Sequence, residues 1–448
     1  MDDSLLSIAF GQLAVLGLLG LALGWLTDRF VGSPVLGGLI AGLLLSASVS
    51  GQWLPDLHQR IFDGGYEAAQ QLQTTQEKLA DQREVLVSTG VTDVAVDGFD
   101  EMAEETLAPM REQVQAEQDR YASALSMMTA VVLGAWLFCS GASVPIGRWR
   151  SHLRDAMPLA LGCLLLVALL ATVGGTLLGR MAAGAEAARW FAGLLIICMA
   201  GALPMSLTLA KRAEDELDDR TSITAGTALV LTLIAWVVAA LVLVPAEAVD
   251  AGAMTIPLRI GDGLGTLVLL ILSLFVLNPL LARRKDVMAR AMVILLFTFV
   301  PFNGFILPLA AGLAFGVSAD ERLRVEKWRR VIAPIAAAAV AMQVDFTGWS
   351  WWLLLVVLIA AGDGKAIGMW LLSKLFGGRT WASAFEMGAA LSVAGLMPVG
   401  LAYLLKQYGL IDESLFAAVI VSAMVIELVM RPLTRVIGAA RRVNQLAK

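Results

Sequence analysis

The sequence is poor in the residues that build catalytic and metal sites. Its 448 residues include three cysteines and two histidines. The cysteines all fall inside apolar runs, which excludes a disulfide framework or redox pair, and the two distant histidines do not make a zinc site. The chain also lacks a glycine-rich phosphate loop, a hydrolytic triad and metal-ligand spacing. We therefore expect no enzyme, no cofactor, no metal and no nucleic-acid partner.

Charge is scarce as well. Only 16% of the residues are charged, against about 25% in soluble domains, while 58% are hydrophobic. These values predict an all-α polytopic membrane protein in contact with lipid. At about 20 residues per span, the apolar runs give about thirteen transmembrane helices. They lie at 5–26, 33–50, 123–145, 156–179, 188–210, 221–245, 262–282, 287–302, 304–318, 331–346, 349–373, 382–405 and 414–434.

The basic residues predict the orientation of the spans. With the N-terminus outside, 23 of the 33 lysines and arginines fall in inside loops. We expect a multi-pass protein of the cell inner (plasma) membrane with a cytoplasmic C-terminus and no cleavable signal peptide. The predicted regions are two first helices at 1–50, an insertion at 51–122, a transmembrane region at 123–438 and a basic cytoplasmic tail at 439–448.

The segment 51–122 does not fit a bilayer. It carries 15 acidic against 5 basic residues and lies outside on the predicted topology. Heptad-spaced apolar residues occur on both sides of a turn near 88–98, which predicts an antiparallel extracytoplasmic helical hairpin. These residues are Leu72, Leu79 and Leu86, then Leu107, Val114 and Tyr121. The hairpin is either a solvated spacer or a surface that contacts a protein partner or a second copy.

Two apolar runs are interrupted midway. The run 188–210 carries Gly201 and Pro204, and the run 382–405 carries Gly395 and Pro398. Unwound backbone inside a membrane is tolerated only where protein or a water-filled cavity covers it, and a matched pair marks the site of many transporters. The two runs cross the membrane in opposite directions, which predicts inverted repeats. Two merely kinked helices are the alternative.

Several motifs, in order, resemble those of the monovalent cation:proton antiporter superfamily, in its second, sodium- or potassium-proton exchanger branch. They are PVLGGLIAGLLL from 34, LGAWLFCSGASVPIGRWRSHLR from 133, GFILPLAAGLAFGVS from 304 and GKAIGMWLLSKLFGGRTWASAFEMGAALSVAGLMPVG from 364. The resemblance covers most of the chain outside 51–122. It implies a homodimer, two crossing discontinuous helices, elevator-like alternating access, and exchange of a monovalent cation for protons.

The family normally keeps one or two aspartates in the sixth span, where cation and protons compete for them. Alignment through Ala235 and Trp236 puts Leu231 and Thr232 at these positions, and the run 222–245 contains no ionisable residue. The chain thus resembles a divergent member that lacks the sixth-helix aspartates. Their absence counts against proton-coupled cation exchange.

Lys365 matches the family's lysine near the middle of the membrane, a counter-charge and proton carrier by that resemblance. A charge at this depth costs about 2.5 to 3.5 kcal/mol, so we expect a function, with a structural ion pair as the alternative. Asp363 would face nearly the opposite side of a regular helix. Gly362 and Gly364 would relax that constraint by local unwinding. Asp363 is the candidate for a relocated carboxylate, or else forms a structural salt bridge.

Other polar groups are candidates for the site. Ser206, Thr232 and Ser392, with backbone carbonyls freed at the breaks, would coordinate a dehydrated cation, and Gln343 would face a cavity. Helix N-termini together with Lys365 would instead favour an anion. Glu427 precedes Arg431 by four residues, which predicts an ordinary pair on a helix surface.

Three functions remain open from the sequence. The main hypothesis is a secondary transporter that exchanges a monovalent cation for protons. The second is a transport-incompetent subunit or sensor that acts through the acidic hairpin, favoured by the missing aspartates. The third is a carrier of an anion or small organic solute.

Overall fold

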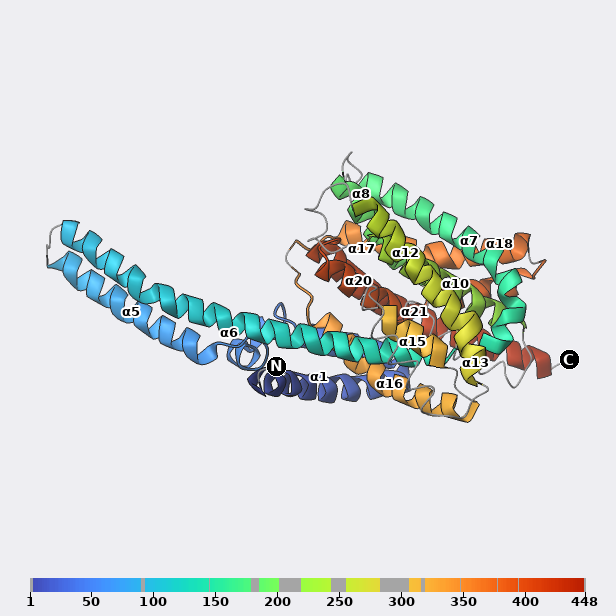
Figure 1. Ribbon diagram of the computed structural model, residues 1–448, viewed down its shortest axis with the longest axis horizontal. Coiled ribbons are helices and arrows are strands. Elements are labelled where there is room, and N and C mark those ends of the chain that lie inside the picture. The colour runs from blue at the N-terminus through green and yellow to red at the C-terminus, as the bar shows by residue number, and fades with distance from the viewer. Residues whose placement is uncertain are drawn as a thin grey trace.

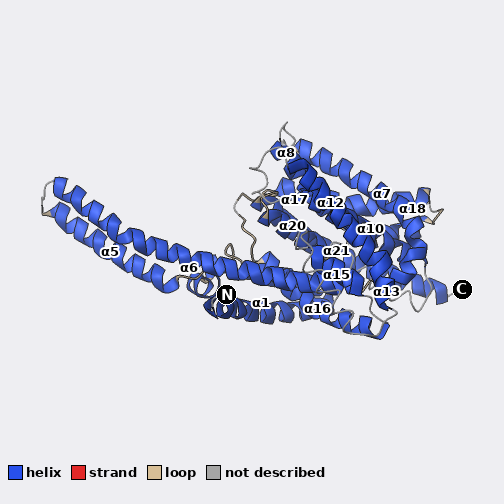
Figure 2. Ribbon diagram, viewed as in Figure 1, coloured by secondary structure: helices blue, strands red, loops and turns tan. Residues whose placement is uncertain are grey.

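The computed structural model describes residues 3–89, 93–144, 146–178, 185–200, 219–242, 255–282, 306–315, 319–346, 348–376, 378–393 and 395–446. Every regular element in these ranges is a helix (Figure 2). Eight of the described helices are long and apolar enough to cross a membrane, and three shorter apolar helices accompany them. The predicted all-α polytopic membrane fold is therefore confirmed. The predicted span 287–302 lies outside the described residues.

The first helix group packs through glycines. A Cβ atom on Gly38 would lie 2.2 Å from the carbonyl oxygen of Pro334, and one on Gly312 would lie 2.2 Å from that of Phe138. Helix backbones approach this closely only where small residues line the contact, as is common between membrane helices. The group consists of α1 (Asp3–Phe30), α2 (Pro34–Leu45), α6 (Asp93–Ala142), α15 (Ile306–Phe315) and α16 (Ala319–Ala341).

The second helix group holds the described parts of both interrupted runs. Its elements are α7 (Ile146–Leu177), α8 (Ala185–Met199), α10 (Asp219–Val242), α17 (Trp351–Val357), η4 (Leu358–Asp363), α18 (Gly364–Leu375), α19 (Trp381–Ser392), α20 (Met397–Gln407) and α21 (Glu413–Leu446). Between the groups lie α12 (Thr255–Leu272), η3 (Ser273–Leu277) and α13 (Asn278–Ala282), with α12 packed on both α10 and α15. The groups also meet directly where α2 contacts α21 and α16 contacts α20.

A long hairpin projects from the bundle (Figure 1). It is formed by α5 (Tyr66–Ser88) and the first part of α6, which pack against each other as predicted. α6 has 50 residues and a length of about 75 Å, so a single helix runs from the hairpin into the bundle. The sequence predicts a boundary between these parts at residue 122, but the helix continues through that position. The sequence changes there from polar to apolar composition, but no residue at that position ends the helix.

The heptad positions form the inner side of the hairpin. Leu107 is buried, and the other five predicted positions are less exposed than most of their neighbours. Across the hairpin, the guanidinium of Arg83 donates to both carboxylate oxygens of Asp100, at 2.8 and 3.1 Å. These hydrogen bonds hold the pKa of the Asp100 carboxyl below its usual value. Apolar contacts and this exposed pair together keep the arms in register.

The base of the hairpin is attached to α1. The Nε2 atom of Gln12 donates to the carbonyl oxygens of Phe62 and Tyr121, at 3.4 Å each. The ring of Tyr121 packs on Gly64, where a Cβ atom would lie 2.3 Å from the ring. Gly64 also has a φ of 74°, which favours glycine. Three short helices complete this base, α3 (Ser50–Trp53), α4 (Pro55–His58) and η1 (Gln59–Asp63).

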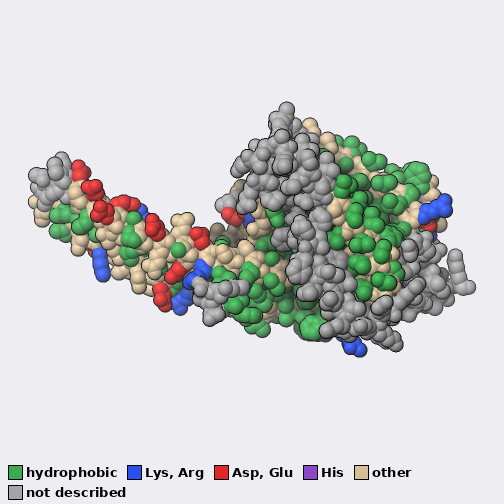
Figure 3. Space-filling model, in the orientation of Figure 1, with side chains coloured by type: hydrophobic (Ala, Val, Ile, Leu, Met, Phe, Trp, Pro, Cys, Tyr) green, Lys and Arg blue, Asp and Glu red, His purple; other side chains and the backbone are tan. Residues whose placement is uncertain are grey.

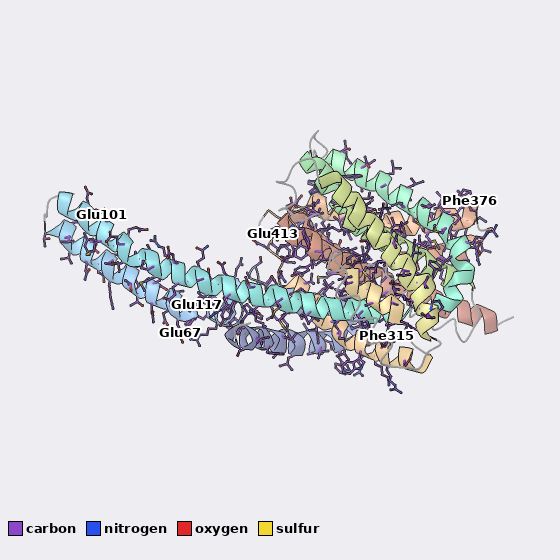
Figure 4. All side chains as sticks on the ribbon, viewed as in Figure 1. Glu67, Glu101, Glu117, Phe315, Phe376 and Glu413 are labelled. Atoms are coloured by element: carbon purple, nitrogen blue, oxygen red, sulfur yellow. The ribbon has the colours of Figure 1, made fainter. Side chains whose placement is uncertain are left out.

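The surface divides by chemistry. Figure 3 shows hydrophobic side chains over the described part of the bundle and acidic side chains along the hairpin. Glu67, Glu101 and Glu117 lie along the hairpin, which leaves the bundle toward the end where Glu413 lies, while Phe376 is at the opposite end (Figure 4). This arrangement agrees with a topology that puts the hairpin and residue 413 on one side of the membrane and residue 376 on the other.

Candidate functional site

Lys365 lies at the start of α18, directly after a π-helical turn. Its side chain is 0% exposed, and its Nζ atom donates to the carbonyl oxygen of Ala200 at 2.9 Å. Ala200 follows Met199, the last residue of α8, in the first interrupted run. The end of a helix exposes carbonyl groups that carry partial negative charge, so an ammonium group is a complementary partner there. The lysine thus connects the eleventh predicted span to the end of α8.

The π-helical turn η4 covers residues 358–363, just where the sequence analysis allowed for local unwinding. Such turns widen a helix and are frequent at functional sites. Asp363 ends this turn and is exposed, whereas Lys365 is buried. No hydrogen bond or ion pair joins these two side chains, in keeping with their opposite sides of the helix.

Cys163 of α7 lies against the start of α18. The Sγ atom of Cys163 lies 4.0 Å from the Lys365 carbonyl oxygen, and a Cβ on Gly368 would lie 3.1 Å from the Cα of Cys163. α7 therefore packs closely on α18 here. Among the described residues no carboxylate pairs with Lys365. A structural ion pair was the alternative role for Lys365. No described residue forms one with it.

The second interrupted run is broken between α19 and α20. α19 ends at Ser392, α20 begins at Met397, and Gly395 between them has a φ of 62°. Pro398 lies in the first turn of α20, where its missing N–H costs no helical hydrogen bond. Of the first break, Gly201, Pro204 and Ser206 lie outside the described residues. α8, which precedes that break, packs against both α20 and α10.

Glu427 reaches the second break from α21. Its side chain is 0% exposed. One carboxylate oxygen accepts the N–H of Gly395 at 2.8 Å, and the other accepts the Ser33 hydroxyl at 2.6 Å and the Nε of Arg431. The predicted pair with Arg431 is present, but the prediction that it lies on the helix surface is wrong, because Glu427 is buried. The four-residue spacing holds, but α21 turns this face toward α2 and the break.

The position of the missing aspartates is filled by apolar packing. Leu231 is buried in one cluster with Met369, Met387 and Leu391, from α18 and α19. The adjacent Thr232 is also buried, and its hydroxyl donates to the carbonyl of Ala228 at 2.7 Å. α10 packs against both α8 and α19. The sixth predicted span thus stands beside both interrupted runs, as the resemblance implies, but presents leucine where an acid is expected.

The other two candidates, Ser392 and Gln343, form hydrogen bonds with groups other than Lys365. The buried Ser392 hydroxyl donates to the carbonyl of Ala389 at 2.9 Å, within its own helix. Gln343 lies at the end of α16, and its side-chain amide donates to the Thr129 hydroxyl at 2.9 Å. Its backbone carbonyl accepts a hydrogen bond from Lys406 Nζ at 2.7 Å. These bonds join α16 to α6 and α20 rather than to either break.

Glu427 is a site residue that the sequence did not single out. The signal was present, because a carboxylate inside the predicted span 414–434 is costly unless it has a defined partner. The spacing to Arg431 supplied an ordinary explanation, and nothing local indicated contacts with Ser33 and Gly395.

No protein-family model and no curated protein sequence matches the chain. Among solved structures, the chain is similar to the sodium proton antiporter MjNhaP1 from Methanocaldococcus jannaschii. The two share 11% sequence identity, the alignment covers 96% of each chain, and the TM-score is 0.57. The similarity therefore extends over the whole fold, and at this identity it establishes the fold alone.

Proposed function

We propose that this chain is a secondary transporter that exchanges a monovalent cation for protons by alternating access, as a homodimer in a lipid membrane. The observation that carries the proposal is the contact of Lys365 with the Ala200 carbonyl. A fully buried ammonium without a carboxylate among the described residues is costly, and such groups in membrane spans mark ion and proton pathways. The fold similarity to a sodium proton antiporter supports the same class.

Lys365 offers a route for coupling without the sixth-span acids. A protonated amine and a monovalent cation both bind carbonyl oxygen, so they compete for the carbonyl group at the end of α8. Binding of the cation favours release of the lysine proton, and reprotonation of the amine favours release of the cation. Competition of this kind links the two fluxes in opposite directions.

The remaining site residues take supporting roles in this proposal. Thr232 and Ser392 bring hydroxyl oxygens on elements that adjoin the breaks, and Ser206 belongs to the first interrupted run. Asp363 supplies a carboxylate next to the π-helical turn. Gln343 contributes at the end of α16, where it is bonded to α6 and α20.

Two observations favour other functions. Leu231 fills the expected acid position with packed side chains, which favours a transport-incompetent subunit that contacts a partner through the acidic hairpin. The positive charge of Lys365, which no carboxylate of the described residues pairs with, instead favours a carrier of an anion or small organic solute. The subunit and the carrier are both alternatives to cation exchange, because each is compatible with the interrupted helices.

Reconstituted vesicles separate these functions. We expect external sodium, potassium or lithium to move protons across vesicles containing the purified chain, followed with an internal pH dye. Empty vesicles are the control. Proton movement with none of the three cations contradicts exchange. Accumulation of a labelled anion by the same vesicles would then support the carrier, and no flux at all would support the subunit.

A further inference from the structure

We propose that Glu427 is a positioning residue for the transport site, which fixes the interruption at Gly395 and ties it to the N-terminus of α2. The role in transport rests on the proposed function above. The contact itself is a property of the fold and is tested separately below.

The interruption needs an acceptor at this point. Val393, Gly395 and Leu396 lie outside both α19 and α20, so their backbone amides lose regular helical partners. In a membrane such groups must be satisfied by the protein, because water is absent. The carboxylate of Glu427 accepts the Gly395 N–H at 2.8 Å. A hydrogen bond to an ionised acceptor is shorter and stronger than one between neutral groups.

The second carboxylate oxygen joins the break to α2. It accepts the hydroxyl of Ser33 at 2.6 Å, and Ser33 Oγ in turn accepts the N–H of Leu36 at 3.2 Å as the N-cap of α2. One acid therefore contacts the start of α2 in the first helix group and the break in the second. The distance between these two backbone features is set by a single side chain.

Arg431 forms an ion pair with Glu427. Its Nε donates to Glu427, and its Nη1 donates to the carbonyl of Gly32, just before α2. A buried ion pair is usually no more stable than apolar residues of the same size, unless further hydrogen bonds satisfy both partners. Here Gly395, Ser33 and Gly32 supply those bonds. Such an arrangement is costly to keep for stability alone and is suited to fixing geometry.

At each of the two interruptions, a charged side chain forms a hydrogen bond with a backbone group. Lys365 donates to a carbonyl at the end of α8, and Glu427 accepts an amide at the break before α20. Each charge matches the backbone group that it meets. Loss of Glu427 frees the segment that follows Ser392, so the cation site loses its fixed backbone while Lys365 stays in place.

Hydrogen exchange tests the contact in the purified full chain in lipid nanodiscs. We expect Glu427→Ala to raise amide exchange at residues 395–396 by about tenfold or more, since the amide loses its acceptor. Glu427→Gln keeps an acceptor oxygen and should raise exchange less. Glu413→Gln is the matched control, because Glu413 is the other acid of α21 and pairs instead with Lys406 at 2.8 Å. Unchanged exchange in folded Glu427→Ala overturns the contact.

A milder pair of variants covers the case in which Glu427→Ala does not fold. Ser33→Ala removes one partner of the carboxylate and should raise exchange at 395–396. Ser422→Ala is its control, because that buried hydroxyl bonds only within α21, to the Val419 carbonyl at 2.8 Å. Equal exchange in the two serine variants contradicts the tie to α2.

Cation flux tests the positioning role. We expect Glu427→Gln to raise the KM for the cation several-fold with a smaller effect on maximal rate, and Glu413→Gln to leave both unchanged. Faster exchange at 395–396 with an unaltered KM overturns positioning and leaves only a structural contact. If the wild-type chain moves no ion, the transport proposal fails, while the exchange result still decides whether Glu427 fixes the break.

Discussion

Lys365 and Ala200 are joined by a 2.9 Å hydrogen bond although they are 165 residues apart in the chain. The bond connects the second residue of α18, which follows a π-helical turn, to the end of a helix in the first interrupted run. It places the one fully buried lysine of the described residues at a backbone group that a cation can also bind. The proposed exchange depends on this geometry.

Lys365 should contribute little to folding. We expect Lys365→Met to change the unfolding free energy in detergent by less than about 1 kcal/mol, because loss of one hydrogen bond is offset by relief of a buried charge. Thermal unfolding followed by size-exclusion chromatography measures this. A loss of several degrees in Tm relative to Lys374→Met, at a half-buried position in the last turn of the same helix, would indicate a structural role instead.

Leu231 should behave as a packing residue. We expect Leu231→Ala to destabilise the protein by about 2 to 5 kcal/mol and Leu231→Met by less than about 1.5 kcal/mol, because the first leaves a cavity and the second nearly conserves volume. Leu264→Ala is the control, since Leu264 is 56% exposed on α12. Chemical unfolding of the three variants checks this, and equal losses at 231 and 264 would show that Leu231 is not packed.

The Arg83–Asp100 pair should make the hairpin sensitive to acid. Arg83 lowers the pKa of Asp100 in the folded hairpin. A lowered folded-state pKa adds stability above the unfolded pKa of about 3.9, and this is lost as pH falls through the folded value. We expect amide exchange in α5, corrected for intrinsic pH effects, to be faster in Asp100→Asn than in wild type at pH 7.

The difference in α5 amide exchange between Asp100→Asn and wild type should shrink below about pH 4, where wild-type Asp100 begins to lose its charge. Asp97→Asn is the matched control, because Asp97 is exposed one turn earlier on α6. A difference that is the same at pH 7 and pH 3 would show that the charge of Asp100 is not the cause.

Hydropathy and local patterns predicted much of the fold. The apolar runs coincide with helices where the structure describes them. The heptad leucines of α5 indicated the hairpin, because burial against lipid or a partner helix imposes those periods directly on the sequence. The continuity of α6 through residue 122 was not predictable in this way. A change from polar to apolar composition marks the membrane boundary, and it does not end a helix.

The candidate site was only partly predictable. Lys365 was identifiable because a lysine within an apolar span is rare and costly. The importance of Glu427 depends on contacts with Gly395 and Ser33, 32 and 394 residues away. Such contacts follow from how α21 packs against α2 and α20, which the pattern of a single apolar helix does not specify.

Proton flux in Lys365→Met tests the central claim most directly. Vesicles of equal protein content should show sodium-, potassium- or lithium-driven proton movement with wild type and with Lys374→Met. We expect a loss of proton movement of at least about tenfold in Lys365→Met, because the exchangeable proton is removed. Proton movement at the wild-type rate in Lys365→Met would contradict the account.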